Sequence, residues 1–387
     1  MKKYLFGLIM FLLLIVDVYA EVDLTSNAKS AILVDNLSGK VLYEKAADEK
    51  LAPASMTKLA SMLIVMEAID NNTLKFDDKV TISEEAANMG GSQIFLEAGE
   101  EYTVHDLLKG VAIASGNDAV VALAEKVGGT QEKFVEMINK RLQEIGAVNT
   151  HFVNPHGLDA EGHYSTARDM SIIARELLKH EKILEYTSIY EEYLEKNDGS
   201  KTWLVNTNKL VRFYDGVDGL KTGFTSTAGY CLTATAKKDN FRLISVVMGE
   251  DTSANRSSDT VKLLNYGFNT YKINIIKKEG EVLGKVRVNR GKVDEVNIIL
   301  VNNVTELLKT NESVSSYKFN LLFDSVKAPV KKGDTVGMAE MIDNDGNVVD
   351  EVEVTVDKDI GKANIFDYIK KNITIVGAGK KTMKQSI

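Results

Sequence analysis

Apolar and polar residues alternate along residues 30–45, and a polar turn at 35–39 interrupts the alternation. This period of two predicts a β-hairpin near the start of the chain. A continuous apolar run from 59 to 69 follows a turn that contains Pro53. An apolar run of this length after a proline turn predicts a helix, and it places Ser55 at the N-terminal end of that helix.

Two capping-box patterns mark the starts of further helices, one at 103–106 and one at 166–169. The first helix is expected to run towards Ser115, and the second to end near His180. The other expected elements are helices at 118–127, 131–145 and 260–271 and strands at 229–235 and 243–248. Residues 21–272 are therefore predicted to form an α+β domain, in which helices pack on an antiparallel sheet.

The pattern changes after residue 272. From 273 to 356, short period-two stretches are separated by turns rich in glycine and aspartate. This predicts a small all-β domain of sandwich type over 273–362. The last segment, 363–387, has apolar residues at helical spacing followed by lysines; these apolar residues are Ile365, Phe366, Ile369 and Ile373. Such a segment either lies on a membrane surface or packs on the β domain.

The N-terminus has the pattern of a secretory signal peptide. Two lysines precede a short apolar run at 4–16, and Val18-Tyr19-Ala20 follows before a polar stretch. Residues 1–20 are therefore predicted to be a signal peptide cleaved after Ala20, and the protein is expected to be exported. The alternative is an uncleaved anchor, although a spanning helix needs roughly 20 apolar residues.

Charge and composition exclude several kinds of partner. The formal net charge of −8 argues against a nucleic-acid partner. The single cysteine, Cys231, allows no internal disulfide bond, and its apolar surroundings predict a buried structural thiol rather than a nucleophile. The five histidines lack the spacing of metal ligands. We therefore expect no metal site.

Three short motifs occur in order along the expected α+β domain: Ser55-Met56-Thr57-Lys58, Ser115-Gly116-Asn117 and Lys221-Thr222-Gly223. Together they are typical of the active site of a penicillin-interacting serine acyl-transfer enzyme. Ser-x-x-Lys also occurs at Ser26 and at Ser315. The first copy directly follows the signal peptide and the second lies in the β domain, so order and local structure select the copy at the helix start.

The first motif provides a nucleophile and a base. A serine hydroxyl becomes a good nucleophile only when a base removes its proton. Positions i and i+3 share one face of a helix, so Lys58 can direct its amine at the oxygen of Ser55. The helix N-terminus also favours negative charge that develops there. For Lys58 to act as the base, its pKa must fall through burial and a second nearby cation, for which Lys221 is the candidate.

The other two motifs predict contacts with a peptide ligand. Ser115 and Asn117 lie in a turn between two expected helices, so both side chains are expected to point freely into a cleft. There they can relay a proton and hold a peptide group. The third motif is expected on an edge strand, where Gly223 lets an extended ligand lie close to the backbone. Lys221 and Thr222 offer donors for a carboxylate.

With these motifs the chain resembles the low-molecular-mass penicillin-binding proteins that are serine-type D-alanyl-D-alanine carboxypeptidases. Blocks at 91–96, 151–159 and 165–170 are also similar to that family, as are the β domain and the amphipathic C-terminus. The resemblance implies a penicillin-binding/β-lactamase-like transpeptidase domain followed by the β sandwich. It implies removal of the terminal D-alanine from peptidoglycan stem pentapeptides without a cofactor. It also implies that β-lactam antibiotics bind covalently.

The resemblance implies a role for each site residue. Ser55 would attack the carbonyl of the penultimate D-alanine and form an acyl-enzyme, which water then hydrolyses. Lys58 would be the general base, and Ser115 would pass a proton to the leaving amine. The implied substrate-binding groups are Asn117 for the substrate backbone, Lys221 for the electrostatics, Thr222 for the terminal carboxylate, and the N–H groups of Ser55 and Phe224 for the oxyanion.

The chain departs from the family pattern at two places. Phe224 stands where some relatives carry histidine, so only a backbone role is expected there. Gly249-Glu250-Asp251 stands where some relatives place an arginine near the substrate carboxylate. Arg256 follows a few residues later, and whether it replaces that arginine is left open.

Three alternative functions would fit some of the same features. A class A β-lactamase needs a glutamate on the loop that corresponds to 154–159, and this loop has none. D,D-endopeptidase activity on peptidoglycan crosslinks would use the same residues and stays open. A non-catalytic wall-binding protein would tolerate loss of Lys58 or Lys221, and both are present. The resemblance and the C-terminal lysines favour peripheral attachment to the outer face of the cytoplasmic membrane.

Overall fold

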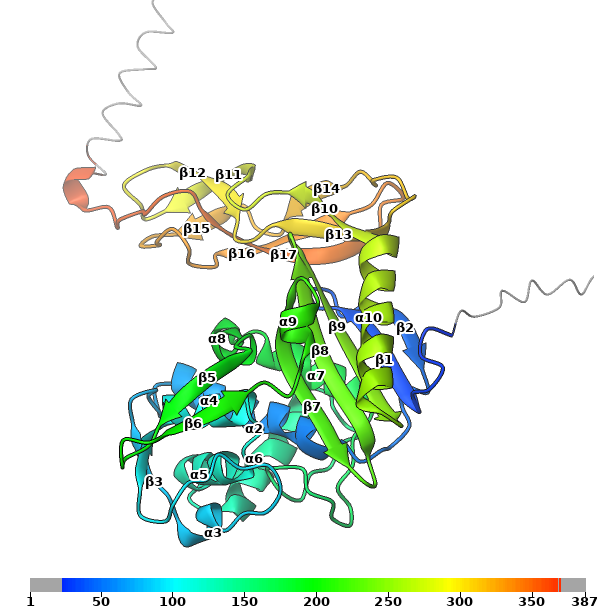
Figure 1. Ribbon diagram of the computed structural model, residues 1–387. Helices are drawn as coiled ribbons and strands as arrows, with labels where there is room; N and C mark the ends of the chain where they lie inside the picture. The colour runs from blue at the N-terminus through cyan, green and yellow to red at the C-terminus, as the bar shows by residue number, and fades with distance from the viewer. Residues whose placement is uncertain (1–22, 368, 370–387) are drawn as a thin grey trace, which may run out of the picture. The chain divides into compact units, whose positions relative to one another are not determined.

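The computed structural model describes residues 23–367 and 369. Contacts within the chain divide it into two compact units, one up to Phe268 and one from Asn269; the boundary expected from the sequence is 272. The first unit combines helices with a sheet, and the second is built from strands (Figure 1). The predicted signal peptide lies outside the described residues.

A five-stranded antiparallel sheet forms the centre of the first unit, in the order β2-β1-β9-β8-β7. Its strands are β1 (Ser30–Asp35), β2 (Val41–Lys45), β7 (Val217–Thr225), β8 (Gly229–Lys238) and β9 (Phe241–Glu250). Strands β1 and β2 form the predicted hairpin. Strand β7, which carries the third motif, lies at an edge of the sheet as predicted.

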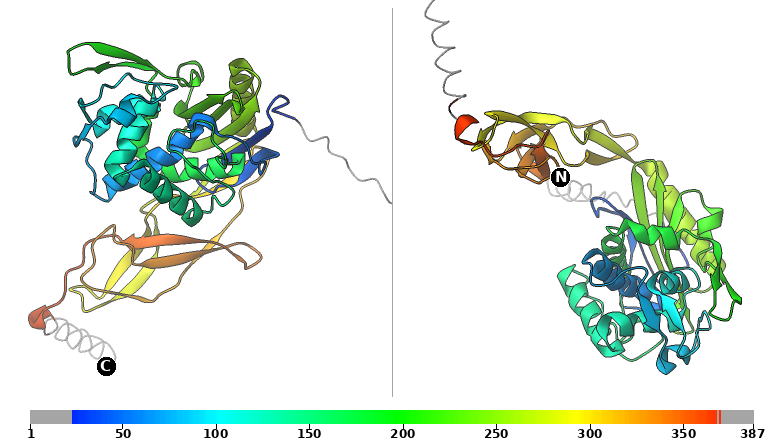
Figure 2. Two further views of the ribbon diagram at one scale, coloured as in Figure 1. Left: turned by 90° about the horizontal axis from the view of Figure 1, so that it is seen from below. Right: turned by 90° about the vertical axis from the view of Figure 1, so that its left-hand side faces the viewer.

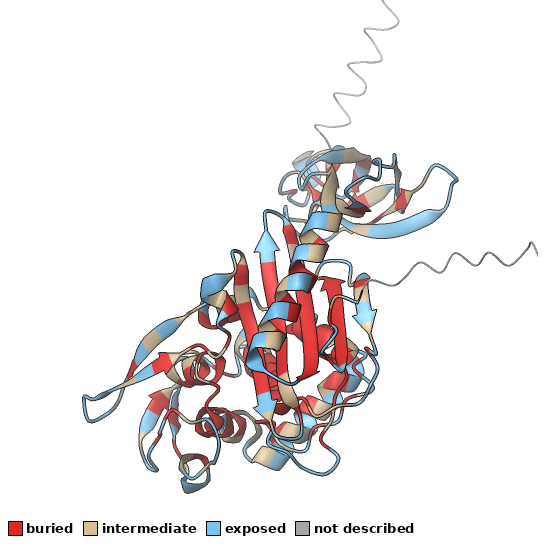
Figure 3. Ribbon diagram, turned by 45° about the vertical axis from the view of Figure 1, so that its right-hand side comes forward, coloured by how far each residue is buried: buried red, intermediate tan, exposed pale blue. Residues whose placement is uncertain are grey.

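Both faces of this sheet are covered, so β1 is buried along its whole length (Figure 3). Ile32 and Val34 point to one face, where they join the main hydrophobic core with residues from the helices. Leu33 points to the other face, beneath helix α10 (Ser253–Thr270). A Cβ added to Gly267 of α10 would lie 3.0 Å from a methyl carbon of Leu33. Alternate residues of one strand therefore fill two different layers.

The larger helices of the core start where the sequence predicts. They are α2 (Lys58–Asp70), α4 (Val104–Ala112), α5 (Asn117–Gly128), α6 (Gln131–Glu144) and α7 (Ala167–Leu177). Thr103 is the N-cap of α4 and Thr166 is the N-cap of α7. The side-chain oxygen of each threonine accepts a hydrogen bond at 3.0 Å from a backbone N–H three residues later. The smaller elements are η1 (Ala54–Thr57), α3 (Glu84–Ala87), η2 (Glu181–Ile183), α8 (Leu184–Thr187), α9 (Leu210–Phe213), β3 (Lys79–Thr81) and β4 (Glu101–Thr103).

Two stretches of the first unit differ from the prediction. Helix α10 begins at Ser253 rather than at 260. The sequence pattern missed its first turns because Arg256 and Asp259 there are charged yet buried. An apolar period cannot reveal such a helix face. The hairpin of β5 (Glu191–Glu195) and β6 (Lys201–Val205) was not predicted. Figure 2 shows this hairpin projecting from the body of the unit.

The second unit is all-β, as predicted. Six strands form a sheet in the order β14-β16-β17-β12-β11-β15, and β10 pairs separately with β13. The strands are β10 (Tyr271–Lys277), β11 (Val282–Asn289), β12 (Glu295–Leu300), β13 (Val304–Lys309), β14 (Lys318–Leu321), β15 (Ser325–Lys327), β16 (Gly337–Ile342) and β17 (Val348–Val356). Val286, Ile298 and Val354 belong to a hydrophobic core of its own.

The start of the C-terminal segment exposes its apolar residues. Ile365, Phe366 and Ile369 are 70%, 76% and 51% exposed. The alternative in which they pack on the β domain is therefore wrong for these three residues. Ile373 and the lysines beyond it lie outside the described residues.

Candidate active site

The first motif lies where η1 passes into α2. Ser55 is half-buried within η1, and Lys58, the first residue of α2, is fully buried. Lys58 Nζ lies 3.0 Å from Ser55 Oγ, within hydrogen-bonding distance. The spacing of three residues therefore places the amine against the hydroxyl, as the sequence predicts.

Two carbonyl oxygens complete the surroundings of the Lys58 amine. Lys58 Nζ donates to Asn117 Oδ1 at 2.6 Å and to the backbone oxygen of His156 at 2.8 Å. The Asn117 Nδ2 group donates to the backbone oxygen of Gly90 at 2.7 Å. The expectation that Asn117 points freely into the cleft is therefore wrong, because its carboxamide joins Lys58 to the loop that begins at Gly90.

Burial and neighbouring cations favour a neutral amine in this site. Burial, and after it the positive charge of Lys221, holds the pKa of Lys58 well below its ordinary value, whereas Asp118 acts in the opposite direction. Burial and the charge of Arg256 in turn lower the pKa of Lys221 to about 7. This direction agrees with the predicted influence of Lys221 on Lys58.

All three motifs contribute to one pocket of about 240 Å³. It is lined by Ser55, Ser92, Ser115, Thr207, Thr222, Gly223, Phe224, Tyr230 and Arg256. Thr222 Oγ1 donates to Thr207 Oγ1 at 2.7 Å, which fixes the hydroxyl of the third motif. A Cβ at Gly223 would lie 2.6 Å from the carbonyl oxygen of Pro53. Glycine is thus needed here for β7 to approach η1, in addition to any approach of a ligand.

Ser115 is held in the left-handed region of backbone conformation, with φ at 64°. This conformation costs a residue with a side chain roughly 1–3 kcal/mol. Backbone hydrogen bonds on its C-terminal side maintain it, from Gly116 to Gly110 at 3.0 Å and from Asn117 to Ser92 at 2.7 Å. The result is that the Ser115 hydroxyl faces the pocket, whereas the last residue of the motif, Asn117, begins helix α5.

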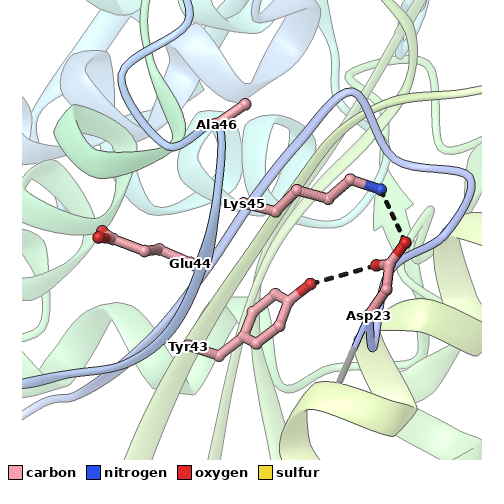
Figure 4. A pocket seen from close by; sticks show the side chains of 5 residues that line it. All are labelled: Asp23, Tyr43, Glu44, Lys45 and Ala46. Carbon is pink, nitrogen blue, oxygen red and sulfur yellow. Dashed lines mark hydrogen bonds and ion pairs between the residues drawn. The ribbon is translucent and has the colours of Figure 1, made fainter. Parts of the chain in front are cut away.

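A larger hollow of about 410 Å³ lies beside β2, away from all three motifs, and is lined by Asp23, Tyr43, Glu44, Lys45 and Ala46 (Figure 4). Asp23 accepts hydrogen bonds from Tyr43 at 3.3 Å and from Lys45 at 3.4 Å. Because these polar groups bond to one another, they tie the start of the described chain to β2. The chemistry of the three motifs is concentrated in the smaller pocket.

Comparison with known proteins agrees with this geometry. A family model described as D-alanyl-D-alanine carboxypeptidase matches residues 17–252. The chain belongs to this family. A second model, the C-terminal domain of penicillin-binding protein 5, matches residues 271–362. The predicted family, fold class and enzyme class are thereby confirmed for this D-alanyl-D-alanine carboxypeptidase.

Individual relatives cover nearly the whole carboxypeptidase chain. The D-alanyl-D-alanine carboxypeptidase DacF of Bacillus subtilis is 47% identical, over 91% of this chain and 90% of the relative. DacC of Escherichia coli is 36% identical, over 89% and 86%. The solved structure of penicillin-binding protein 5 from Haemophilus influenzae aligns with a TM-score of 0.68 at 33% identity, covering 87% of this chain and 98% of that one. These matches favour a carboxypeptidase over the β-lactamase alternative.

The pocket of the carboxypeptidase also contains residues that sequence reasoning missed or left open. Arg256 lines it, with its guanidinium carbon 6.0 Å from the centroid of the Tyr230 ring. Arg256 therefore lies at the same pocket as Thr222 and Gly223 of the third motif. Ser92 lies inside the family-like block at 91–96, which was the available signal. Thr207 and Tyr230 carried no signal, because contacts with β7 place them at the pocket: Thr207 accepts a hydrogen bond from Thr222, and Tyr230 pairs with Phe224.

Two further predictions concern groups outside the pocket. Cys231 is fully buried, and burial raises the pKa of its thiol to about 11. A thiol that stays protonated has little nucleophilic character, which supports the structural interpretation. Within residues 23–367 and 369, no cluster of three or more histidine, cysteine or acidic side chains could hold a metal ion.

Proposed function

We propose that this D-alanyl-D-alanine carboxypeptidase forms an acyl-enzyme on Ser55 with Lys58 as the general base. The surroundings of the Lys58 amine carry this proposal. A neutral amine has two N–H donors and one lone pair. The oxygens of Asn117 and His156 can only accept, and together they use both donors. In this neutral form the lone pair would be left to accept the hydroxyl hydrogen of Ser55, whose oxygen lies 3.0 Å from the amine nitrogen.

The reaction would follow from this arrangement. As Ser55 Oγ attacks the carbonyl carbon of the penultimate D-alanine, its proton moves to the Lys58 amine. The N–H groups of Ser55 and Phe224 would stabilise the oxyanion. Ser115 would relay that proton from Lys58 to the nitrogen of the departing D-alanine, which returns Lys58 to its neutral form. Lys58 would then activate the water that hydrolyses the acyl-enzyme, and a β-lactam ring would acylate Ser55 in the same way.

Recognition of the terminal carboxylate would fall to Thr222 and Arg256. Arg256 is only 7% exposed, and its buried Nε has no hydrogen-bond partner among the described residues. A buried donor without a partner is costly, and a bound carboxylate would satisfy it. Lys221 would contribute by its charge beneath the pocket, and Asn117 would position Lys58.

The test of this function is release of D-alanine from a stem pentapeptide. We expect stoichiometric free D-alanine from the acid and little release of D-alaninamide from the same peptide with a C-terminal amide, because the amide lacks the carboxylate. Arg256→Gln should lower kcat/KM for the acid by about 10- to 100-fold, the loss of a hydrogen bond to a charged group. The exposed Arg287 supplies the control variant Arg287→Gln, which should behave like the wild type.

The same measurement separates the endopeptidase alternative. Cleavage of a crosslink releases one peptide from another and yields no free D-alanine. Equal turnover of the acid and the amide, or an Arg256→Gln variant with unchanged kinetics, would contradict carboxylate recognition by Arg256. Crosslinked dimers cleaved faster than pentapeptides would make the endopeptidase the main activity.

We further propose that the protein is exported and attached peripherally to the outer face of the cytoplasmic membrane. No helix within residues 23–367 and 369 is long and apolar enough to cross a membrane. The exposed Ile365, Phe366 and Ile369 would supply apolar burial. The lysines after them would be attracted to anionic lipid by roughly 1 kcal/mol each near the surface; they are Lys370, Lys371, Lys380, Lys381 and Lys384.

Truncation tests this attachment. Ala363 is buried and its N–H donates to the Arg290 carbonyl, so the truncation is best placed after it, removing 364–387. The truncated protein should move to the soluble fraction while keeping its activity on a small peptide. High salt should weaken attachment of the full chain without abolishing it, because part of the binding is apolar. A truncated protein that remains in the membrane fraction would make an uncleaved N-terminal anchor the better explanation.

A further inference from the structure

The β5–β6 hairpin presents two aromatic rings to solvent. Tyr193 and Trp203 are directly opposite each other in the strand register. Their side chains are exposed by 61% and 58%. On the other face of the same hairpin, Leu194 and Leu204 are almost fully buried and belong to the main core. The hairpin therefore packs on the core through one face only, and the aromatic pair on the other face is not part of the core.

This hairpin is fixed to the catalytic unit. Lys109 of α4 forms an ion pair with Glu192 at 3.0 Å. Directly after β6, Asn206 Nδ2 donates to the backbone oxygens of Thr187 at 3.0 Å and Ile189 at 2.8 Å. The next residue is Thr207, which lines the catalytic pocket. The outer face of the hairpin thus holds a set position relative to the pocket, and Figure 2 shows the hairpin projecting from the body of the unit.

The chemistry of the outer face suits a carbohydrate. By strand alternation, Tyr193 and Trp203 share this face with the exposed Glu191, Glu195 and Lys201. Flat aromatic rings can stack on the C–H faces of sugar rings, and carboxylates and an ammonium can hydrogen-bond hydroxyl and N-acetyl groups. A polyanion is disfavoured by the two carboxylates. A protein partner is disfavoured because charged groups surround the rings on a small face.

The distance from the aromatic pair to the catalytic pocket matches the length of the stem peptide in the proposed substrate. Trp203 precedes Thr207 by four residues, so their Cα atoms lie at most roughly 14 Å apart. A pocket of about 240 Å³ accommodates only the end of a stem peptide. The four peptide residues before the scissile bond span a similar length, roughly 14 Å when extended. The sugar that carries the stem would then lie outside the pocket, about as far from it as Trp203 does.

We propose that Tyr193 and Trp203 form a carbohydrate-stacking subsite that holds the glycan strand of peptidoglycan while its stem peptide occupies the catalytic pocket. This inference rests on the proposed function for the identity of the glycan. It assigns the unpredicted hairpin a part in substrate selection: the enzyme would favour stems that are still attached to sugar over free peptides.

The chain offers a direct probe, because Trp203 is its only tryptophan. Titration with β-1,4-linked N-acetylglucosamine oligomers, which carry no peptide, should shift Trp203 fluorescence to shorter wavelength and saturate. The free pentapeptide should produce no such shift. Tyr193→Ala should weaken the affinity for the oligomer by up to about 10-fold, the scale of one aromatic contact. Fluorescence that does not change up to millimolar oligomer would overturn the proposal.

Kinetics provide the second test. The double variant Tyr193→Ala/Trp203→Ala should lose about 10-fold or more in kcat/KM on glycan-linked pentapeptide and keep its kcat/KM on free pentapeptide. Leu37→Ala, which removes another residue that is 63% exposed, is the control and should affect neither substrate. An equal loss on both substrates would overturn the proposal by showing that the rings only support the fold. Oligomer binding is measured without turnover. The fluorescence titration therefore tests the carbohydrate subsite even if the proposed reaction is wrong.

Discussion

Replacing Ser55 with alanine should abolish both D-alanine release and the formation of a penicillin adduct. The alanine variant keeps Lys58 and the pocket but has no oxygen to carry the acyl group. Loss of a serine nucleophile lowers kcat by on the order of 10⁴-fold or more. The wild-type protein incubated with benzylpenicillin should give a covalent adduct on the peptide that contains Ser55. Mass spectrometry of the intact protein and of its peptides measures both results.

The chain supplies a matched control for this experiment. Ser315 begins another Ser-x-x-Lys sequence, in the second unit. Ser315→Ala should retain the full adduct and full activity. A stable adduct on any serine other than Ser55 would refute the assignment of the nucleophile. Rapid hydrolysis of penicillin without a build-up of adduct would instead indicate a β-lactamase.

Replacing Lys58 with arginine should lower activity by at least about 10², the lower range for loss of a positioned acid–base group. Arginine keeps the positive charge but cannot become neutral at any accessible pH, so it cannot accept the Ser55 proton. In the wild type, the neutral fraction of Lys58 grows as pH rises through its lowered pKa. The acid limb of the pH–rate profile should therefore lie well below the ordinary lysine value of 10.5.

Two controls keep this second prediction interpretable. Lys126, whose exposed amine donates to the Lys79 carbonyl, provides the variant Lys126→Arg, which should retain normal rates. Because Lys58 is buried among fixed partners, arginine could disturb the fold, so thermal unfolding is measured for each variant. Lys58→Met is closer in volume and should be equally inactive. Near-normal turnover in either folded Lys58 variant would exclude Lys58 as the base.

Local sequence was sufficient wherever a few neighbouring residues decide the outcome. The capping residues Thr103 and Thr166 mark helix starts because their side chains bond backbone groups three residues away. The contact between Ser55 and Lys58 has the same origin, since three residues along a helix return a side chain to the same face. Period-two patterns likewise identified the first hairpin and the all-β second unit.

Sequence patterns failed where charged or polar residues are buried by distant parts of the chain. The first turns of α10 turn Arg256 and Asp259 inward, so an apolar period could not detect them. Buried and exposed residues alternate along the strands of the β5–β6 hairpin, but many residues of its outer face are charged. Without knowledge of the core beneath Leu194 and Leu204, nothing separated it from a solvated loop.

The sequence by itself determined the identity and order of the three motifs, the two-part organisation, and the local pairing of the proposed nucleophile and base. Tertiary structure decided the environment of the Lys58 amine, on which the proposed reactivity of this pair depends. The Asn117 carboxamide and the His156 carbonyl come from segments 59 and 98 residues away from Lys58. Lys221 and Arg256 add their charges from β7 and α10. The pKa of a buried amine depends on burial and on neighbouring charges in space, and spacing along the chain specifies neither.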